Sequence, residues 1–317
     1  MNCAKPFKTH DEQLNILESR GIDFSKPSSK SNAKKWLQRI GYYNLINGYS
    51  SPFSDTNDKD KYLQGATIDE IYSLYLFDRK MRQIFLKHIL PLETNVKSLV
   101  AYYFPMAHPE ANYLVYQNFD TSGKDCSKHI IDLIAEIQRQ IASRVSDPSI
   151  SHYLNKYGYV PLWVLNNILT LGTISKFYSL MKQVERQKIS KVFHLLDNEL
   201  ESILTYISSV RNFCAHGNRL YCYRSKRPLC DTKLHEKMNI AKTERGEYSN
   251  GKRDLFAVLI ALKLTLSKTE FQEVIKDIDI ALNKLSKKLH TIKIGVILDM
   301  MGFPADWKKK LSVKLDS

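Results

Sequence analysis

The stretch TIDEIYSLYLFDRKMRQIFLKHILPLETNVKSLVAYYF, residues 67–104, joins a helix-start signal to a long apolar repeat. Thr67 and Glu70 form the T-x-x-E pattern of a capping box, in which each side chain accepts a hydrogen bond from the other residue's backbone N–H. Apolar residues then recur every three or four positions, which is the spacing of one face of an α-helix. The pattern predicts a long helix from Thr67, with a kink or break at Pro91 because proline lacks the N–H that the helical ladder needs.

Helical spacing also dominates the rest of the chain, and THDE at residues 9–12 is a second capping box. There is no convincing β-alternation and no internal repeat, so the expected fold is all-α, a helical bundle. We expect an N-terminal helical extension over residues 1–66, a helical core over 67–240 and C-terminal helices packed on it over 241–317, with one continuous domain as the alternative. Further helical periods lie at residues 32–40, 127–145, 161–171, 173–181, 197–216, 254–267 and 271–289.

The composition points to a basic protein of a reducing compartment. The 317 residues include 47 Lys and Arg against 33 Asp and Glu, a net charge of +14, which is typical of proteins that bind nucleic acids, although it also serves solubility. Five cysteines with no C-x-x-C pair indicate neither a disulfide framework nor a zinc site, and we expect no metal and no cofactor. No membrane-length apolar run and no signal peptide is present, so we expect a soluble, cytoplasmic protein.

Charged residues fall on helix faces that otherwise carry apolar side chains. Arg211 lies within the apolar stripe of the helix predicted at 197–216, where an unpaired buried charge would cost several kcal/mol, so it requires an acidic partner. Asp78, Arg82 and Glu93 fall on the stripe of the long helix. Asp78 and Arg82, four residues apart, are best explained as a structural ion pair. Glu93 is the expected partner of Arg211, and Asp78 is the second choice. The pair of Glu93 and Arg211 is either purely structural or also orients a functional site.

The stretch RNFCAHGNRL, residues 211–220, collects groups that suit phosphate chemistry. Arginine binds phosphate through two charge-assisted hydrogen bonds, and histidine can move a proton near neutral pH. A single histidine at a helix end is more often a favourable charge beside the helix dipole. Here His216 has Arg211, Asn212 and Arg219 within nine residues, and this combination favours phosphoryl transfer.

Arg211-Asn212-Phe213-Cys214-Ala215-His216 resembles the R-N-x-x-x-H signature of HEPN-superfamily ribonucleases. More narrowly, the chain resembles the AbiD/AbiF type of abortive-infection protein, which shares this motif with the type VI CRISPR effectors. The resemblance extends over most of the chain, and the ordered set of matching stretches is far more specific than the motif alone. These stretches are IGYYNLINGY (40–49), LYLFDRKMRQIFLKHILPLE (74–93), PLWVLNNILTLGTISKFYSLM (161–181), RNFCAHGNRLY (211–221) and MGFPADW (301–307).

The resemblance implies a bundle of HEPN type that forms a homodimer, in which two R-N-x-x-x-H motifs meet in one cleft and cleave RNA without a metal. It makes His216 the general acid and base, Arg211 the residue that orients phosphate and stabilises the transition state, and Asn212 a residue that fixes geometry. Such cleavage uses the ribose 2′-hydroxyl as nucleophile. Many relatives carry a larger residue after the histidine, where this chain has Gly217, and this difference leaves the rate of turnover open.

Two functions from different classes fit these observations. The first is a toxin-like endoribonuclease of phage defence, held in check by a partner. The second is a non-catalytic protein of the same fold that grips a structured non-coding RNA. In either case the predicted RNA-binding residues are Arg219, Tyr221, Arg224, Lys226 and Arg227. The tyrosines Tyr42, Tyr43, Tyr49, Tyr221 and Tyr223 either stack on unpaired bases or belong to the core.

Overall fold

The computed structural model describes residues 6–58 and 60–314 and is all-α, as the sequence predicts. Within these ranges the chain forms α-helices joined by loops and short 3₁₀ or π turns, and β-type pairing is limited to isolated bridges such as that between Ser54 and Tyr62. The helices in the first half are α1 (His10–Ser19), α2 (Ser29–Ile40), the π turn η1 (Tyr43–Asn47), the 3₁₀ turn η2 (Ser51–Phe53), α3 (Ile68–Ala107), the 3₁₀ turn η3 (Tyr116–Asn118), α4 (Cys126–Ser143) and α5 (Pro148–Tyr157).

Short helices are more frequent in the second half, which also contains the long connections 216–232 and 238–254. They are α6 (Leu162–Leu165), α7 (Leu171–Leu180), α8 (Gln183–Lys191), α9 (Asp197–Ala215), α10 (Lys233–Lys237), α11 (Leu255–Thr265), α12 (Lys268–Ser286), α13 (Ile294–Met301) and α14 (Trp307–Leu311).

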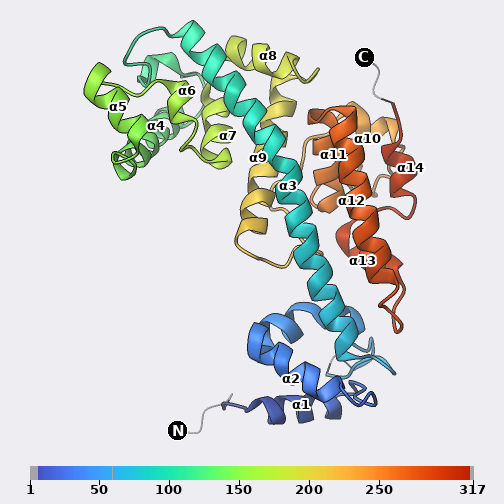
Figure 1. Ribbon diagram of the computed structural model, residues 1–317. Coiled ribbons are helices and arrows are strands. Elements are labelled where there is room, and N and C mark those ends of the chain that lie inside the picture. Colours follow the sequence, from blue (N-terminus) through green and yellow to red (C-terminus); the bar gives the residue numbers. More distant parts are fainter. Residues whose placement is uncertain (1–5, 59, 315–317) are drawn as a thin grey trace.

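Helix α3 is the axis of the molecule (Figure 1). Its 40 residues extend over about 60 Å, with α1 and α2 at its N-terminal end and α4–α8 around its C-terminal end. The predicted capping box at its start is confirmed, because the Thr67 side chain accepts from the Glu70 N–H and the Glu70 carboxylate accepts from the Thr67 N–H at 3.2 Å. The capping box predicted at Thr9 and Glu12 is also present at the start of α1.

The expected break at Pro91 is absent, since α3 continues through this residue without interruption. Pro91 lies on the exposed side of the helix, where its ring faces solvent and the unpaired carbonyl four residues earlier can bind water. Ile89 before it and Leu92 and Val96 after it are buried in the core, so packing supports the helix on both sides of the proline.

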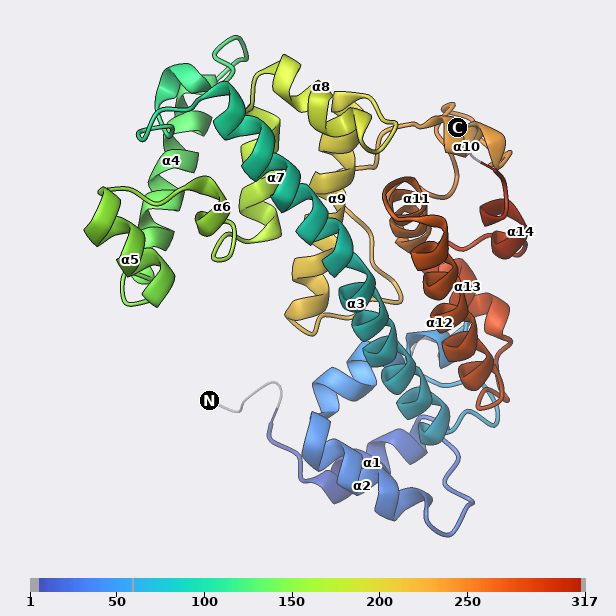
Figure 2. The ribbon, with the colours of Figure 1, turned by 45° about the horizontal axis from the view of Figure 1, so that its top comes forward.

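Three helices cover α3 along its length. Helix α9 packs against α7 and against one side of α3, to which it runs antiparallel. Helix α12 packs along the other side of α3 (Figures 1 and 2). Helix α11 lies against α3, α9 and α12, and its nine buried positions explain why its sequence is apolar almost all round. The core is therefore continuous from the N-terminal helices to the C-terminal ones.

Some local expectations differ from the structure. Residues 161–171 form only the short α6 followed by a turn, and the cap of α7 is Thr170, whose hydroxyl accepts from the Thr173 N–H at 3.1 Å, in place of Thr173. Helix α10, which falls within the expected core of residues 67–240, lies beside α14 (Figure 2). The Lys310 ammonium donates to the carbonyls of Met238 and Asn239, at 3.0 and 3.1 Å, and so ties α14 to the end of α10.

Candidate functional site

The R-N-x-x-x-H motif occupies the last turn of α9 and its C-terminal cap. Helix α9 ends at Ala215 with His216 as the capping residue, and Gly217 follows with a φ of 69°, a left-handed conformation that glycine adopts without steric cost. The Gly217 N–H donates to the Cys214 carbonyl and the Asn218 N–H donates to the Phe213 carbonyl. This is a Schellman motif, as the glycine predicts, and it turns the chain away directly after the histidine.

His216 opens into a cleft of about 580 Å³ between the end of α9 and the N-terminal helices. The residue is exposed, and it shares the cleft with three arginines that come from separate parts of the chain: Arg39 at the end of α2, Arg82 on α3 and Arg219. The exposed Arg39 and Arg219 make this cleft suitable for a phosphate, whereas Arg82 is buried and its charge is paired with Asp78. Tyr43, Asn44 and Asn47 from the π turn η1 line the same cleft.

Asp78 and Arg82 form the expected ion pair within α3, and this pair anchors the loop that follows the motif. The buried Asp78 carboxylate accepts from the backbone N–H groups of Leu220 and Tyr221, at 3.0 and 2.6 Å, and from the Tyr49 hydroxyl at 2.8 Å. Burial raises the pKa of Asp78, and the Leu220 N–H and the charge of Arg82 oppose this effect. Asp78 does not pair with Arg211, so its role is to position the 218–221 loop.

Arg211 lies opposite Glu93, the acidic partner that the helix faces indicate. The Arg211 Nε is 3.7 Å from Glu93 Oε2, and the Lys97 ammonium is 2.9 Å from Glu93 Oε1. The Glu93 side chain is 8% exposed, whereas that of Arg211 is 32% exposed, more than its place on the apolar stripe suggests. Glu93 thus holds two cations, and its Oε2 atom accepts no hydrogen bond from the described part of the chain.

Asn212 faces a different neighbour, the N-terminus of α7. A Cβ atom added at Gly172 would lie 3.9 Å from Asn212 Nδ2 and 3.6 Å from the Thr170 hydroxyl, both ordinary van der Waals distances, so Asn212 lies next to the start of α7. Neither Arg211 nor Asn212 lines the cleft that contains His216. Within one chain, the three motif residues therefore point to three separate surroundings.

The residues predicted to bind RNA divide into exposed cations and a buried tyrosine. Arg219, Arg224, Lys226 and Arg227 are exposed, although Arg219 also donates to the carbonyls of Asn47 and Gly48, both at 3.0 Å. Tyr221 is 1% exposed and cannot stack on a base, which corrects that assignment. Its ring packs beside Tyr49 in the core.

The other tyrosines considered for base stacking are also divided between the core and the surface. Tyr49 and Tyr223 are buried, and Tyr42 is partly buried. Tyr43 is 77% exposed and remains free to stack on a ligand. Sequence reasoning missed Arg39 and the amides Asn44 and Asn47, which reach the cleft only through the packing of α2 and η1 near α9. The segment IGYYNLINGY that contains these amides was the one signal for them.

Among residues 6–58 and 60–314, no group of three or more His, Cys, Asp or Glu side chains is arranged to hold a metal ion. No helix in the same ranges is long and apolar enough to cross a membrane.

Comparison with known proteins gives one family match. The family model of the Abi-like proteins matches residues 35–222, a range that begins in α2 and ends after the motif. It includes η1, α3, α9 and every residue of the His216 cleft. No curated protein and no solved structure matches the chain. Because the matched residues make up more than half of its length, the chain belongs to the Abi-like protein family.

Proposed function

We propose that this Abi-like protein is a metal-independent endoribonuclease of abortive infection, and that its active site forms between two copies of the chain. Family membership suggests the role in phage defence. The resemblance to HEPN ribonucleases of the AbiD/AbiF type suggests the chemistry. The observation that carries the proposal is the exposed His216 in a cleft that it shares with Arg39, Arg82 and Arg219.

The chemistry is an internal transfer of the phosphoryl group. A base removes the proton from the ribose 2′-hydroxyl, its oxygen forms a bond to phosphorus, and the bond from phosphorus to the 5′-oxygen breaks as an acid protonates the leaving group. His216 supplies the acid or base function, and Arg211 binds the phosphate oxygens while charge develops on them. The products are a 2′,3′-cyclic phosphate and a 5′-hydroxyl, and DNA is not cleaved because it lacks the nucleophile.

A second copy of the chain supplies what one copy lacks. One histidine cannot easily serve as base on one side of the phosphate and as acid on the other, and Arg211 does not line the cleft of its own chain's His216. A two-fold axis beside the ends of two α9 helices would bring two motifs to one phosphate. Glu93, which is paired with Arg211 at 3.7 Å, keeps that arginine oriented until the substrate arrives.

The test is cleavage of total cellular RNA by the purified protein in EDTA, with the ends of the products mapped. We expect 2′,3′-cyclic phosphate and 5′-hydroxyl ends. His216→Ala should abolish cleavage and retain RNA binding, while His129→Ala, which removes an exposed histidine on α4, should cleave normally. Full activity of His216→Ala, or products with 5′-phosphate ends, would exclude the proposed mechanism.

The alternative is a protein of the same fold that binds a structured RNA without cleaving it. The exposed cations Arg224, Lys226 and Arg227 favour this second function, because they form a basic surface beyond the cleft. Tight binding with no cleavage across many RNAs, unchanged by His216→Ala, would select it.

A further inference from the structure

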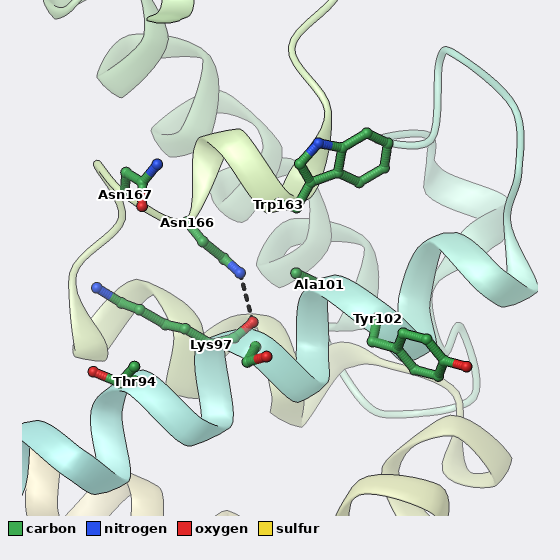
Figure 3. Close-up of a pocket in the computed structure, with 8 residues that line it drawn as sticks. Thr94, Lys97, Ala101, Tyr102, Trp163, Asn166 and Asn167 are labelled. Atoms are coloured by element: carbon green, nitrogen blue, oxygen red, sulfur yellow. Dashed lines mark hydrogen bonds between the residues drawn. The ribbon is translucent and has the colours of Figure 1, made fainter.

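A second pocket lies on the other side of the Arg211–Glu93 pair, further along α3. It has a volume of about 610 Å³ and is open to solvent between α3 and α6 (Figure 3). Trp163 and the Asn166 amide come from α6 and the turn after it, whereas the side chains of Lys97 and Tyr102 come from α3. Ala101 lies between them, and its small side chain leaves the space open.

Two large aromatic side chains are exposed at this pocket. Trp163 is 56% exposed and Tyr102 is 64% exposed. An exposed aromatic face costs free energy in water and is the usual platform on which an unpaired base stacks.

The polar groups of the pocket have unused hydrogen-bonding capacity. The Asn166 amide nitrogen donates to the Lys97 carbonyl oxygen, but Asn166 Oδ1 accepts no hydrogen bond from the described residues. This side chain is 7% exposed, and a buried acceptor without a donor costs about 1–3 kcal/mol. Oδ1 is itself buried, so it would reach a ligand N–H, such as an amino group or ring N–H of a base, only if the amide turned and released the Lys97 carbonyl.

Two ion pairs that share Glu93 also connect the pocket to the motif. Lys97, which lines the pocket, is paired with Glu93 at 2.9 Å, and Glu93 is paired with Arg211. Arg82 of the His216 cleft and Lys97 of the pocket are fifteen residues apart on α3, or about 22 Å. A strand that leaves the cleft and passes Arg211 along α3 therefore reaches the pocket.

We propose that this pocket binds an unpaired nucleobase of the RNA strand, with Trp163 as the stacking platform and Asn166 as the group that contacts the edge of the base. The inference rests on the proposed function, because it assigns single-stranded RNA as the substrate of that same site. A base within a duplex is already stacked and paired, so the pocket accepts only unpaired nucleotides.

The experiment measures RNA binding in the His216→Ala background, where the substrate stays intact, by anisotropy of labelled single-stranded and duplex RNA. Trp163→Ala should weaken binding of the single strand by roughly tenfold and leave duplex binding unchanged. Trp163→Phe should retain most of the affinity, and Ala101→Trp should fill the pocket and weaken binding as Trp163→Ala does. Phe7→Ala is the matched control, since Phe7 is an exposed aromatic residue that lines neither site.

Tryptophan fluorescence gives an independent reading. The chain has three tryptophans, of which Trp36 is partly buried and stacked on Tyr72 and Trp307 is buried, so Trp163 is the most exposed of them. Single-stranded RNA should quench this emission, and the quenching should disappear in Trp163→Phe. Quenching by AMP at the concentrations that suffice for RNA would assign the pocket to a free nucleotide and overturn the proposal.

Other outcomes separate this proposal from the proposed function. Trp163-dependent binding by a wild-type protein that cleaves no RNA would support the pocket and refute the ribonuclease. Normal cleavage, with single-strand affinity unaffected by Trp163→Ala, would refute the pocket alone. The absence of any RNA binding in the His216→Ala background would refute the pocket and also the retained binding that the proposed function expects of this variant. A shift of Trp163→Ala to a smaller mass in light scattering would show that a second copy of the chain covers the pocket, which also overturns it.

Discussion

At the scale of single residues, each motif side chain is held by a different neighbour. Glu93 pairs with Arg211, Asn212 lies beside Gly172 at the start of α7, and the Schellman turn at Gly217 leaves His216 exposed. The carboxylate of Glu93 forms ion pairs with both Arg211 and Lys97.

A double-mutant cycle measures the coupling between Glu93 and Arg211. Glu93→Gln and Arg211→Lys should each reduce cleavage more than tenfold, because each leaves the guanidinium position without its orienting contact. The pair should contribute about 1 kcal/mol to the free energy of unfolding, a modest value because one third of the Arg211 side chain is exposed to screening solvent. Urea unfolding of the wild type, the two single variants and the double variant gives the coupling free energy in stability. The cleavage rates of the same four proteins give the coupling in catalysis.

The control for this cycle is Glu136→Gln, which removes an exposed carboxylate paired with Arg139 on α4 and should change both quantities little. Strictly additive losses in stability and in rate would show that Glu93 does not position Arg211.

At the scale of elements, α3 contributes residues to the His216 cleft and to the second pocket, and it also contains a proline in its interior. Pro91 removes one hydrogen bond from the middle of a helix on which the cleft, the Arg211–Glu93 pair and the second pocket all depend. Tertiary packing on both sides of α3 outweighs the intrinsic cost of a proline in a helix, which is about 3 kcal/mol.

Pro91→Ala should therefore stabilise the protein, by about 1–3 kcal/mol, because alanine restores the missing N–H and relieves the clash with the preceding turn. The proline is exposed, so little packing is lost. Thermal unfolding measures the change. Pro228→Ala, in an exposed loop outside any helix, should instead be neutral or slightly destabilising, and an equal gain in both variants would contradict the helical explanation.

Helix α11 begins at a buried carboxyl group that makes stability depend on pH. Asp254 caps α11 by accepting from the Ala257 N–H, and burial raises its pKa from 3.8 to about 6. Between these values the folded protein holds a proton that the unfolded chain has released. The contribution of this group to stability is therefore present below about pH 4 and is lost as the pH rises to 6, by about 3 kcal/mol.

Asp254→Asn removes the titration and keeps the oxygen that caps the helix. The free energy of unfolding of this variant, relative to the wild type, should rise by about 3 kcal/mol between pH 4 and pH 7. Urea titrations at both pH values test this, with Asp132→Asn on the surface of α4 as the control. A difference between variant and wild type that stays constant with pH would refute the assignment to Asp254.

At the scale of the whole molecule, two observations favour the proposed two-chain ribonuclease. They are the net charge of +14 and the separate surroundings of the three motif residues. A basic surface attracts polyanions such as RNA from a distance, and under the proposed function the motif would be completed when two chains meet.

We predict a homodimer at micromolar concentration, with activity that falls faster than linearly on dilution. Light scattering measures the mass. Adding inactive His216→Ala to wild-type protein should suppress activity beyond simple dilution, because mixed dimers contain only one histidine, whereas adding an unrelated basic protein should not. A monomer whose activity is linear in concentration would rule out the composite site.

Local patterns in the amino-acid sequence were sufficient for the all-α class, the capping boxes at Thr9 and Thr67, the end of α9 at Gly217 and the facing pair of Arg211 and Glu93. The fold class, the caps and the helix end depend on backbone hydrogen bonds within a few residues. For the pair, the angular spacing within α3 and within α9 indicates the faces on which Glu93 and Arg211 lie, and the packing of the two helices makes the contact. The burial of Tyr221, the continuity of α3 through Pro91 and the meeting of Arg39 with His216 depend on contacts between segments far apart in the chain. No local pattern contains them, because burial and convergence arise only when the helices pack.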